Sequence, residues 1–165
     1  MSKYFFEIER KFQLEGRGSA VDVEIFSNAA LLPTGVPLND ESRQERLDQL
    51  EELLRRFRQT EQTCLTMPAT HHAVARAFVD GGDTDSLLRI LNNRVEFGIF
   101  PDDYTYTYLL EHFLSTENFR DGARVAVALM LQEEFKIPIA SQMALYSTYS
   151  YVQNLKDQVQ TLLRY

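Results

Sequence analysis

Apolar residues recur every three or four positions through most of this chain, and this spacing predicts amphipathic helices. A strongly charged helix is expected at 42–62, with an apolar stripe made by Leu47, Leu50, Leu53, Leu54 and Phe57. Ser42-Arg-Gln-Glu45 gives it the sequence of a capping box, in which side chains and backbone amides satisfy one another. An earlier helix is expected at 3–15, with one face formed by Tyr4, Phe5, Ile8 and Phe12.

Residues 20–32 fit two interpretations. Apolar residues alternate over 21–25 as in a strand, whereas Ile25, Ala29 and Leu32 keep helical spacing. Because helices are predicted elsewhere and no second convincing strand is available to pair with, we prefer a helix here.

From residue 68 the pattern repeats with a period of about 35 residues. The matching pairs are Thr70 with Thr105, Val74 with Leu109, and Phe78 with Phe113. The potential helix caps Asp83 and Asn118 keep the same separation. A fixed period built from two capped helices predicts a solenoid of helical hairpins, because one hairpin cannot bury its apolar face alone.

A third unit follows at a separation of 36 residues, which pairs Phe113 with Tyr149 and Asn118 with Asn154. Its first helix is expected at about 140–151 and its second from Asn154, with an apolar stripe of Leu155, Val159, Leu162 and Leu163. We expect these apolar C-terminal helices to meet further chain or a partner protein.

The stretch between the first two repeats contains clear stop and start signals. Gly98 suits the position after a helix C-terminus, and Pro101 cannot continue a helix. Asp102 or Asp103 can then cap the next helix, because a short carboxylate accepts hydrogen bonds from the first turn. A helix break followed by a new helical hairpin is therefore predicted here.

The same stretch resembles two known patterns. G-I-F-P-D followed by Y-T-Y and a helical hairpin resembles a pentatricopeptide repeat junction. The longer run GIFPDDYTYTYLLEHFLSTENFRDGARVAVALMLQEEFKIP resembles the mitochondrial ribosomal small-subunit protein 27 family. The strong resemblance covers about 86–152, and a weaker one reaches back through 42–62. It implies a matrix protein of the small ribosomal subunit that supports mitochondrial translation and contacts rRNA and neighbouring ribosomal proteins.

The charge of the chain limits how it can bind RNA. The net charge is −7, and residues 70–139 hold six Lys/Arg against eleven Asp/Glu. Because affinity for nucleic acid comes largely from phosphate neutralisation, we expect no tight autonomous RNA binding.

The N-terminal segment is unlike a mitochondrial transit peptide, since it contains Glu7, Glu9 and Glu15.

The pentatricopeptide resemblance implies particular RNA-facing positions. In such proteins each repeat can read a base through side chains on its first helix and at its end. If repeats begin at Pro68 and Asp103, these positions fall on His72 with Asp102, and on Thr107. Arg76 is a further RNA-facing candidate.

Two other groups have an RNA-binding and a structural interpretation. Arg55, Arg56 and Arg58 form either an RNA-binding patch or a solvated face that complements the dipole at a helix C-terminus. Two of them are also predicted to form i,i+4 ion pairs, Glu51 with Arg55 and Glu52 with Arg56. Tyr104, Tyr106 and Tyr108 suggest a base-stacking platform. Residues two apart do not share a helix face, so we expect at least one of them, Tyr106, in the core.

The sequence contains no recognisable catalytic or metal-binding motif. His71 and His72 are adjacent and cannot chelate as an i,i+4 pair, and the lone Cys64 has no cysteine partner. Gly81-Gly82 lacks the lysine of a phosphate loop and is expected to be a hairpin turn. We therefore predict no enzymatic activity, no cofactor and no metal site, and no apolar run is long enough to span a membrane.

The predicted fold is all-α: an antiparallel helical-hairpin α-solenoid of pentatricopeptide-like repeats with an N-terminal helical element. Residues 1–40 hold that element and the Pro/Gly linker at 33–37, and residues 41–165 hold the repeats (about 68–102, 103–139 and a partial 140–165). The predicted function is a non-enzymatic structural component of the mitochondrial small ribosomal subunit. The alternatives are a free pentatricopeptide RNA-binding factor for mitochondrial transcripts and a protein-only adaptor solenoid.

Overall fold

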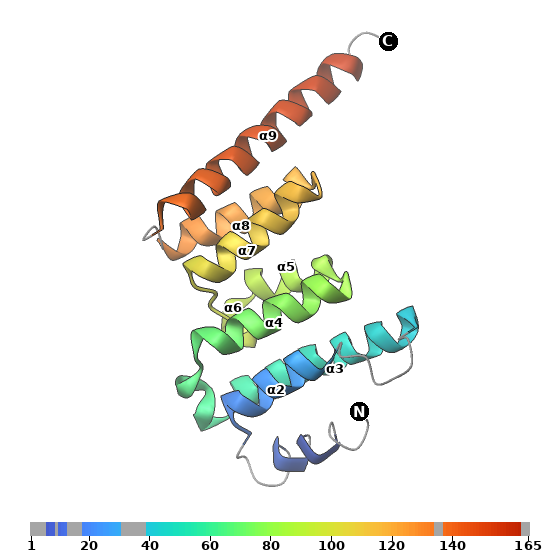
Figure 1. The fold of residues 1–165 in the computed structure, drawn as a ribbon, viewed down its shortest axis with the longest axis vertical. Coiled ribbons are helices and arrows are strands. Elements are labelled where there is room, and N and C mark those ends of the chain that lie inside the picture. Colours follow the sequence, from blue (N-terminus) through green and yellow to red (C-terminus); the bar gives the residue numbers. More distant parts are fainter. Residues whose placement is uncertain (1–5, 9, 13–17, 31–38, 134–136, 163–165) are drawn as a thin grey trace. The chain divides into compact units, whose positions relative to one another are not determined.

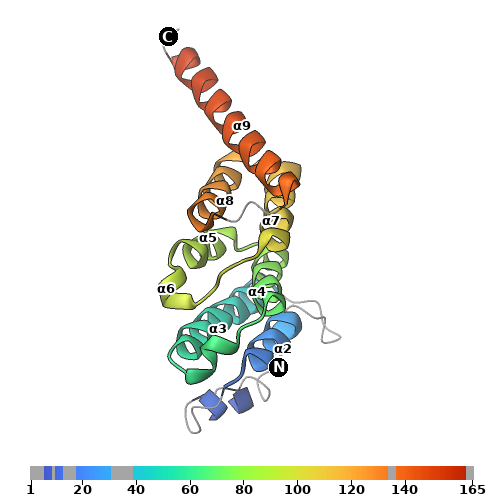
Figure 2. The ribbon, with the colours of Figure 1, turned by 90° about the vertical axis from the view of Figure 1, so that its left-hand side faces the viewer.

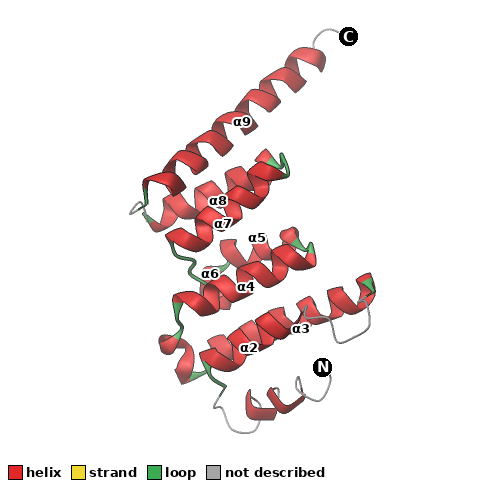
Figure 3. Cartoon of the chain, in the orientation of Figure 1, coloured by secondary structure: helices red, strands yellow, loops and turns green. Residues whose placement is uncertain are grey.

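The described part of the chain is all-helical. The computed structural model describes residues 6–8, 10–12, 18–30, 39–133 and 137–162, and these form helices and turns only (Figures 1 and 3). The elements are α2 (Ala20–Ala30), α3 (Asp40–Arg58), the 3₁₀ helix η2 (Glu61–Leu65), α4 (Pro68–Gly81), α5 (Thr84–Asn92), α6 (Arg94–Phe97), α7 (Asp103–Ser115), α8 (Phe119–Gln132) and α9 (Pro138–Leu162). They group into two compact units, Met1–Phe100 and Pro101–Tyr165.

The first unit is built from α2 to α6. Helix α2 packs against both α3 and α4, α4 packs against α5, and α3 contacts α6. The helix preferred for residues 20–32 is confirmed as far as Ala30, but its predicted face is wrong. Val23 and Phe26 are buried, whereas Ile25 is 44% exposed. The helical face that α2 buries is set by the position of α3 and α4, which the local spacing does not encode.

Residues near the N-terminus also contribute to this core. Ile8 and Phe12 are buried, and the Phe12 ring meets the Phe57 ring of α3 edge-on at 6.1 Å between centroids. The other two residues of the predicted stripe, Tyr4 and Phe5, lie outside the described residues, as does the predicted linker at 33–37.

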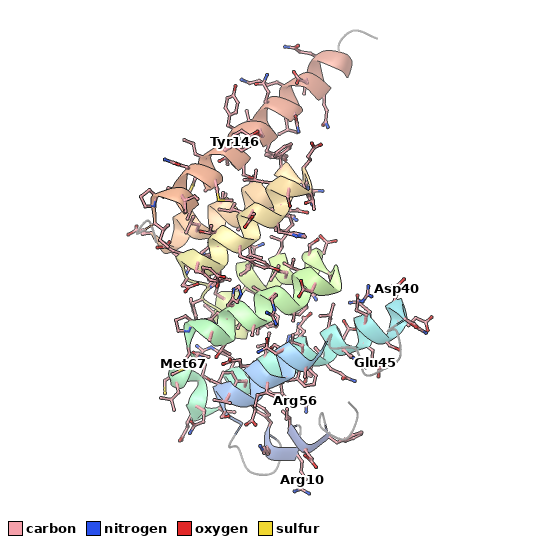
Figure 4. All side chains as sticks on the ribbon, in the orientation of Figure 1. Arg10, Asp40, Glu45, Arg56, Met67 and Tyr146 are labelled. Atoms are coloured by element: carbon pink, nitrogen blue, oxygen red, sulfur yellow. The ribbon has the colours of Figure 1, made fainter. Side chains whose placement is uncertain are left out.

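Helix α3 confirms its predicted apolar stripe but not its predicted cap. Leu47, Leu50, Leu53, Leu54 and Phe57 are all buried. The helix begins at Asp40, with Asn39 at the N-cap, so Ser42 and Glu45 lie inside it and form no capping box (Figure 4). Asp40 and Glu41 are acidic residues in the first turn, where negative charge is favourable, and they extend the helix upstream.

Helix boundaries in the two units repeat with the period found in the sequence. Helices α4 and α7 begin 35 residues apart, α5 and α8 begin 35 apart, and α6 and α8 end 35 apart. The backbone agrees: the described residues with positive φ form two pairs at the same separation, Gly82 with Glu117 and Gly98 with Glu133. Both predicted helix stops at glycine, Gly82 and Gly98, are confirmed as left-handed caps.

The second helix of each hairpin starts at a side-chain cap, as the sequence predicted. Asp83 accepts a hydrogen bond from the Ser86 amide at 3.0 Å, and Asn118 accepts one from the Asp121 amide at 3.3 Å. Burial alone would raise the pKa of the Asp83 carboxyl, but hydrogen bonds from Gln44 and Ser86, with the charge of Arg89, bring it below the ordinary 3.8.

Replacing either cap with alanine is expected to cost about 1 kcal/mol of unfolding free energy at pH 7, because the first-turn amide loses its acceptor. The loss of unfolding free energy should depend on pH in one variant and not in the other. The folded pKa of Asp83 is lowered, so its charge stabilises the fold above pH 3.8 and ceases to do so as pH falls through the folded value. Denaturant titrations should therefore show the Asp83→Ala penalty shrinking below pH 3.8, with no such change for Asn118→Ala. An equal pH response in both variants would contradict this.

The second unit consists of the α7–α8 hairpin and α9, which contacts both helices. The approach of α8 to α9 is close at Gly122, where a Cβ atom would lie 2.3 Å from the Ser147 hydroxyl oxygen. Ala140, Ala144 and Ser147 line the buried side of α9. Small residues on both helices thus allow the tight packing.

The predicted second helix of the third unit is absent. Instead of ending near Tyr151 and restarting at Asn154, α9 continues without a break to Leu162, and its C-terminal half extends beyond the α7–α8 hairpin (Figures 1 and 2). Residues 151–155 include no glycine or proline, so nothing in the local sequence stops the helix.

Candidate RNA-facing residues

Two of the predicted RNA-facing residues lie one turn apart on α4. His72 is half-buried, and Arg76 is exposed. The Arg76 guanidinium donates to the side-chain oxygen of Asn28 on α2 at 2.9 Å and lies 3.9 Å from the Asp80 carboxylate. Because exposed pairs of this kind are weak, Arg76 can exchange them for a phosphate at small cost.

The other two candidates, Asp102 at the end of the first predicted repeat and Thr107 on α7, have structural hydrogen bonds. One carboxylate oxygen of Asp102 accepts from both the amide and the hydroxyl of Thr105, at 2.9 and 2.7 Å, and so caps α7. The Thr107 hydroxyl donates to the backbone carbonyl of Asp103 at 2.7 Å. Of the two predicted caps, Asp102 is therefore the one that caps α7, whereas Asp103 is buried in the first turn of the helix.

The same helical positions differ in charge between the repeats. At a separation of 35 residues, Thr107 on α7 corresponds to His72 on α4, and the exposed Glu111 corresponds to Arg76. The equivalent positions are therefore basic on α4, and one of them is acidic on α7. This is unlike a continuous phosphate-binding track, which needs positive charge throughout.

The arginines at the end of α3 contact α6 and their own helix. Arg55 bonds to Glu51 one turn earlier and to Glu96 of α6, each at 2.9 Å, and its guanidinium lies 5.2 Å from the centre of the Phe97 ring. The Arg58 guanidinium donates to the Val95 carbonyl at 3.0 Å. These contacts tie the last turn of α3 to α6.

Arg56, labelled in Figure 4, pairs with Glu52 at 2.9 Å, so both predicted i,i+4 ion pairs of α3 are present. All three arginines lie in the last turn of α3, where positive charge complements the helix dipole. The geometry of this patch therefore agrees with its structural interpretation, although the side chain of Arg55 remains 42% exposed.

The tyrosines of α7 are divided between core and surface. Tyr106 is fully buried, and its hydroxyl donates to the side chain of Gln132 on α8, which in turn donates to the Pro101 carbonyl at 3.3 Å. Tyr104 is 63% exposed. The prediction that the three tyrosines form no common platform, with Tyr106 in the core, is confirmed.

A family model for the mitochondrial 28S ribosomal protein S27 matches residues 1–162. The chain belongs to this family. The resemblance found in residues 86–152 is thereby confirmed and extended over nearly the whole sequence. Membership of the S27 family makes the chain a mitochondrial protein of the small ribosomal subunit.

Across the described residues, no three His, Cys, Asp or Glu side chains come together in a way that could hold a metal ion. His71 is buried, and its Nδ1 accepts a hydrogen bond from the Phe100 amide at 3.5 Å. In the same part of the chain, no helix is both long and apolar enough to cross a membrane.

Glu51 makes a second ion pair that the sequence did not predict. Its side chain is only 8% exposed, and its two oxygens bond to Arg55 on α3 and to Arg89 on α5. Spacing within α3 indicated the first pair, but nothing local indicates Arg89, which lies 38 positions further along the chain.

Proposed function

We propose that this S27 family chain is a non-enzymatic scaffold within the mitochondrial small ribosomal subunit, in the matrix. In this proposal its helical hairpins at 68–102 and 103–139, followed by a partial unit at 140–165, stack as a pentatricopeptide-like solenoid behind the N-terminal element at 1–40. The observation that carries the proposal is the coincidence of helix boundaries and positive-φ residues at a 35-residue separation. Repeats of this kind expose long surfaces suited to binding several neighbours.

Contact with neighbouring ribosomal proteins is assigned to the outer face of α8. Val127, Met130 and Leu131 lie at helical spacings of three and four and are 49, 42 and 72% exposed. Apolar side chains gathered on one exposed face mark protein interaction sites, because their removal from water is favourable.

Contact with rRNA is assigned to His72 and Arg76 on α4, with Arg76 supplying charge to a phosphate. The exposed guanidinium and its weak present partners support this choice. The acid Glu111 at the matching position of α7 favours a local contact over readout of a base sequence, so the affinity should depend on neighbouring proteins.

Sedimentation of the tagged full-length protein through a sucrose gradient tests the proposal. We expect the wild type in small-subunit fractions. Val127→Glu combined with Leu131→Glu should release most of it, because charge on the α8 face opposes apolar burial. Val95→Glu, an equivalent change at an 80% exposed residue of α6, should have little effect. Absence of the wild type from these fractions would overturn the ribosomal scaffold.

The alternative is a free RNA-binding factor, favoured by the placement of His72 and Arg76 on one face of α4. It requires sub-micromolar affinity for mitochondrial transcripts at physiological salt and a steep salt dependence. We expect a filter-binding assay to give a response near background for the isolated chain. A strong response that Arg76→Glu abolishes would favour the free factor. Ribosome association unaffected by Arg76→Glu would favour an adaptor that binds protein only.

A further inference from the structure

The C-terminal half of α9 has almost no packing. Residues 152–160 are all exposed, although α9 is the longest helix of the described chain at 25 residues. Where this half passes the start of α8, the two are separated by an open groove of about 450 Å³, lined by residues of both helices that include Phe119, Arg120, Leu155 and Gln158. Helices in proteins owe most of their stability to packing of an apolar face, and this half of α9 has little of it.

The N-terminal half of α9 exposes positions that the two preceding hairpins bury. In the 36-residue register, Leu145 corresponds to Leu109, and Tyr149 corresponds to Phe113. Leu109 and Phe113 are 0 and 1% exposed, whereas Leu145 and Tyr149 are 67 and 65% exposed. Tyr146, labelled in Figure 4, adds a further 58% exposed aromatic to this side of α9. The exposed apolar face of α9 therefore corresponds to the face that α7 buries in the core of its hairpin.

The C-terminal half has the sequence of the helix that would cover this face. Asn154 corresponds to the α8 cap Asn118, and Val159 corresponds to Ala123, which is buried in α8. Val159 itself is 54% exposed. The residue before the cap also matches, since Gln153 corresponds to Glu117, whose φ is +55° in the turn between α7 and α8.

We propose that α9 has a second, closed conformation in which residues 154–162 fold back onto its N-terminal half as the second helix of a third hairpin. The chain turns at Gln153 in the left-handed conformation, and Asn154 caps the new helix. Two exposed apolar faces of one straight helix cannot cover each other, but a hairpin buries both. The gain in apolar burial opposes the strain of a left-handed glutamine, so closure depends on the balance of these two effects.

A disulfide between two introduced cysteines distinguishes the conformations. In the α7–α8 hairpin a Cβ atom on Gly122 would lie 3.4 Å from the Cβ of Phe113, which is close to the Cβ–Cβ separation of a disulfide. The corresponding pair is Tyr149→Cys with Gln158→Cys, in a Cys64→Ser background. In the straight helix these residues are about 13 Å apart along the axis, too far for a disulfide.

The control pair is Ser141→Cys with Ser150→Cys, which has the same nine-residue separation but lies entirely before the turn. We expect the test pair to form at least about fivefold more intramolecular disulfide than the control, measured by mass spectrometry on monomeric protein after mild oxidation. Gln153→Gly should raise the yield of the test pair, because glycine adopts the left-handed conformation of the turn without strain. Asn154→Ala should lower it, because the new helix loses its N-cap. Equal yields for test and control pairs would overturn the proposal.

Hydrogen exchange on the protein without introduced cysteines provides an independent measurement. A hairpin leaves the amides at the turn, residues 152–154, fast to exchange between two protected segments. A straight helix gives protection that falls steadily toward the C-terminus. The second pattern, found alone, would also overturn the closed conformation.

Discussion

Replacing Tyr106 with alanine is expected to lower the free energy of unfolding of the second unit by about 3–5 kcal/mol. The ring is fully buried within this unit, so its removal leaves a large cavity as well as losing apolar burial. The change also removes the hydroxyl that bonds to Gln132, which leaves a part-buried amide with one partner fewer. The measurement is denaturant unfolding followed by circular dichroism.

The matched control for this variant is Tyr104→Ala, the same change two residues earlier on α7. Its side chain is 63% exposed, so the expected effect is within about 0.5 kcal/mol. If Tyr106 instead stacked on RNA from the surface, the two variants would have similar stability and differ only in RNA binding. Similar stability would therefore contradict the buried position of Tyr106.

Replacing Glu51 with glutamine is expected to cost about 2 kcal/mol, because two charge-assisted hydrogen bonds to a buried carboxylate are weakened together. The estimate stays below that for a fully buried ion pair, since Arg55 and Arg89 are 42 and 52% exposed and can be solvated. The loss should appear in the unfolding midpoint of the first unit.

Glu52→Gln provides the comparison for this variant. Glu52 lies next to Glu51 on α3 and has a comparable arginine partner, Arg56 at 2.9 Å, but its side chain is 47% exposed. Exposed pairs contribute little, so the expected cost is about 0.5 kcal/mol or less. A Glu52→Gln penalty equal to that of Glu51→Gln would show that burial of the Glu51 carboxylate has no effect on its contribution.

Much of the hairpin architecture could be predicted from the sequence because its signals are local. A cap such as Asp83 acts on an amide three residues away, and Gly82 ends α4 through its own backbone conformation. The buried series at Val74 and Phe78, repeated at Leu109 and Phe113, follows from helical spacing alone. The helix start predicted from the capping box at Ser42 was wrong, because the acidic residues upstream also favour a first turn. A motif alone does not decide which of two possible starts the helix uses.

The candidate site was predicted less completely. Spacing correctly placed Arg55 and Arg56 opposite acids of their own helix, but the attachment of Arg55 to Glu96 and of Arg58 to the Val95 carbonyl joins α3 to α6 across some forty residues. No periodicity encodes such a pair, because it depends on which helix faces come together. The RNA-facing roles of His72, Arg76, Asp102 and Thr107 remain predictions.

The sequence by itself determined the helix caps and stops of the two hairpins, the 35-residue repeat and the S27 family resemblance, because each depends on neighbouring residues or on a contiguous string. Only the tertiary structure decided that α2 buries Val23 in place of Ile25, that Glu51 bridges two arginines, and that α9 runs past Asn154 as one helix. The physical reason is that burial and pairing are properties of surfaces brought together from distant segments. In α9, a cap residue alone cannot end a helix when no second helix packs against it.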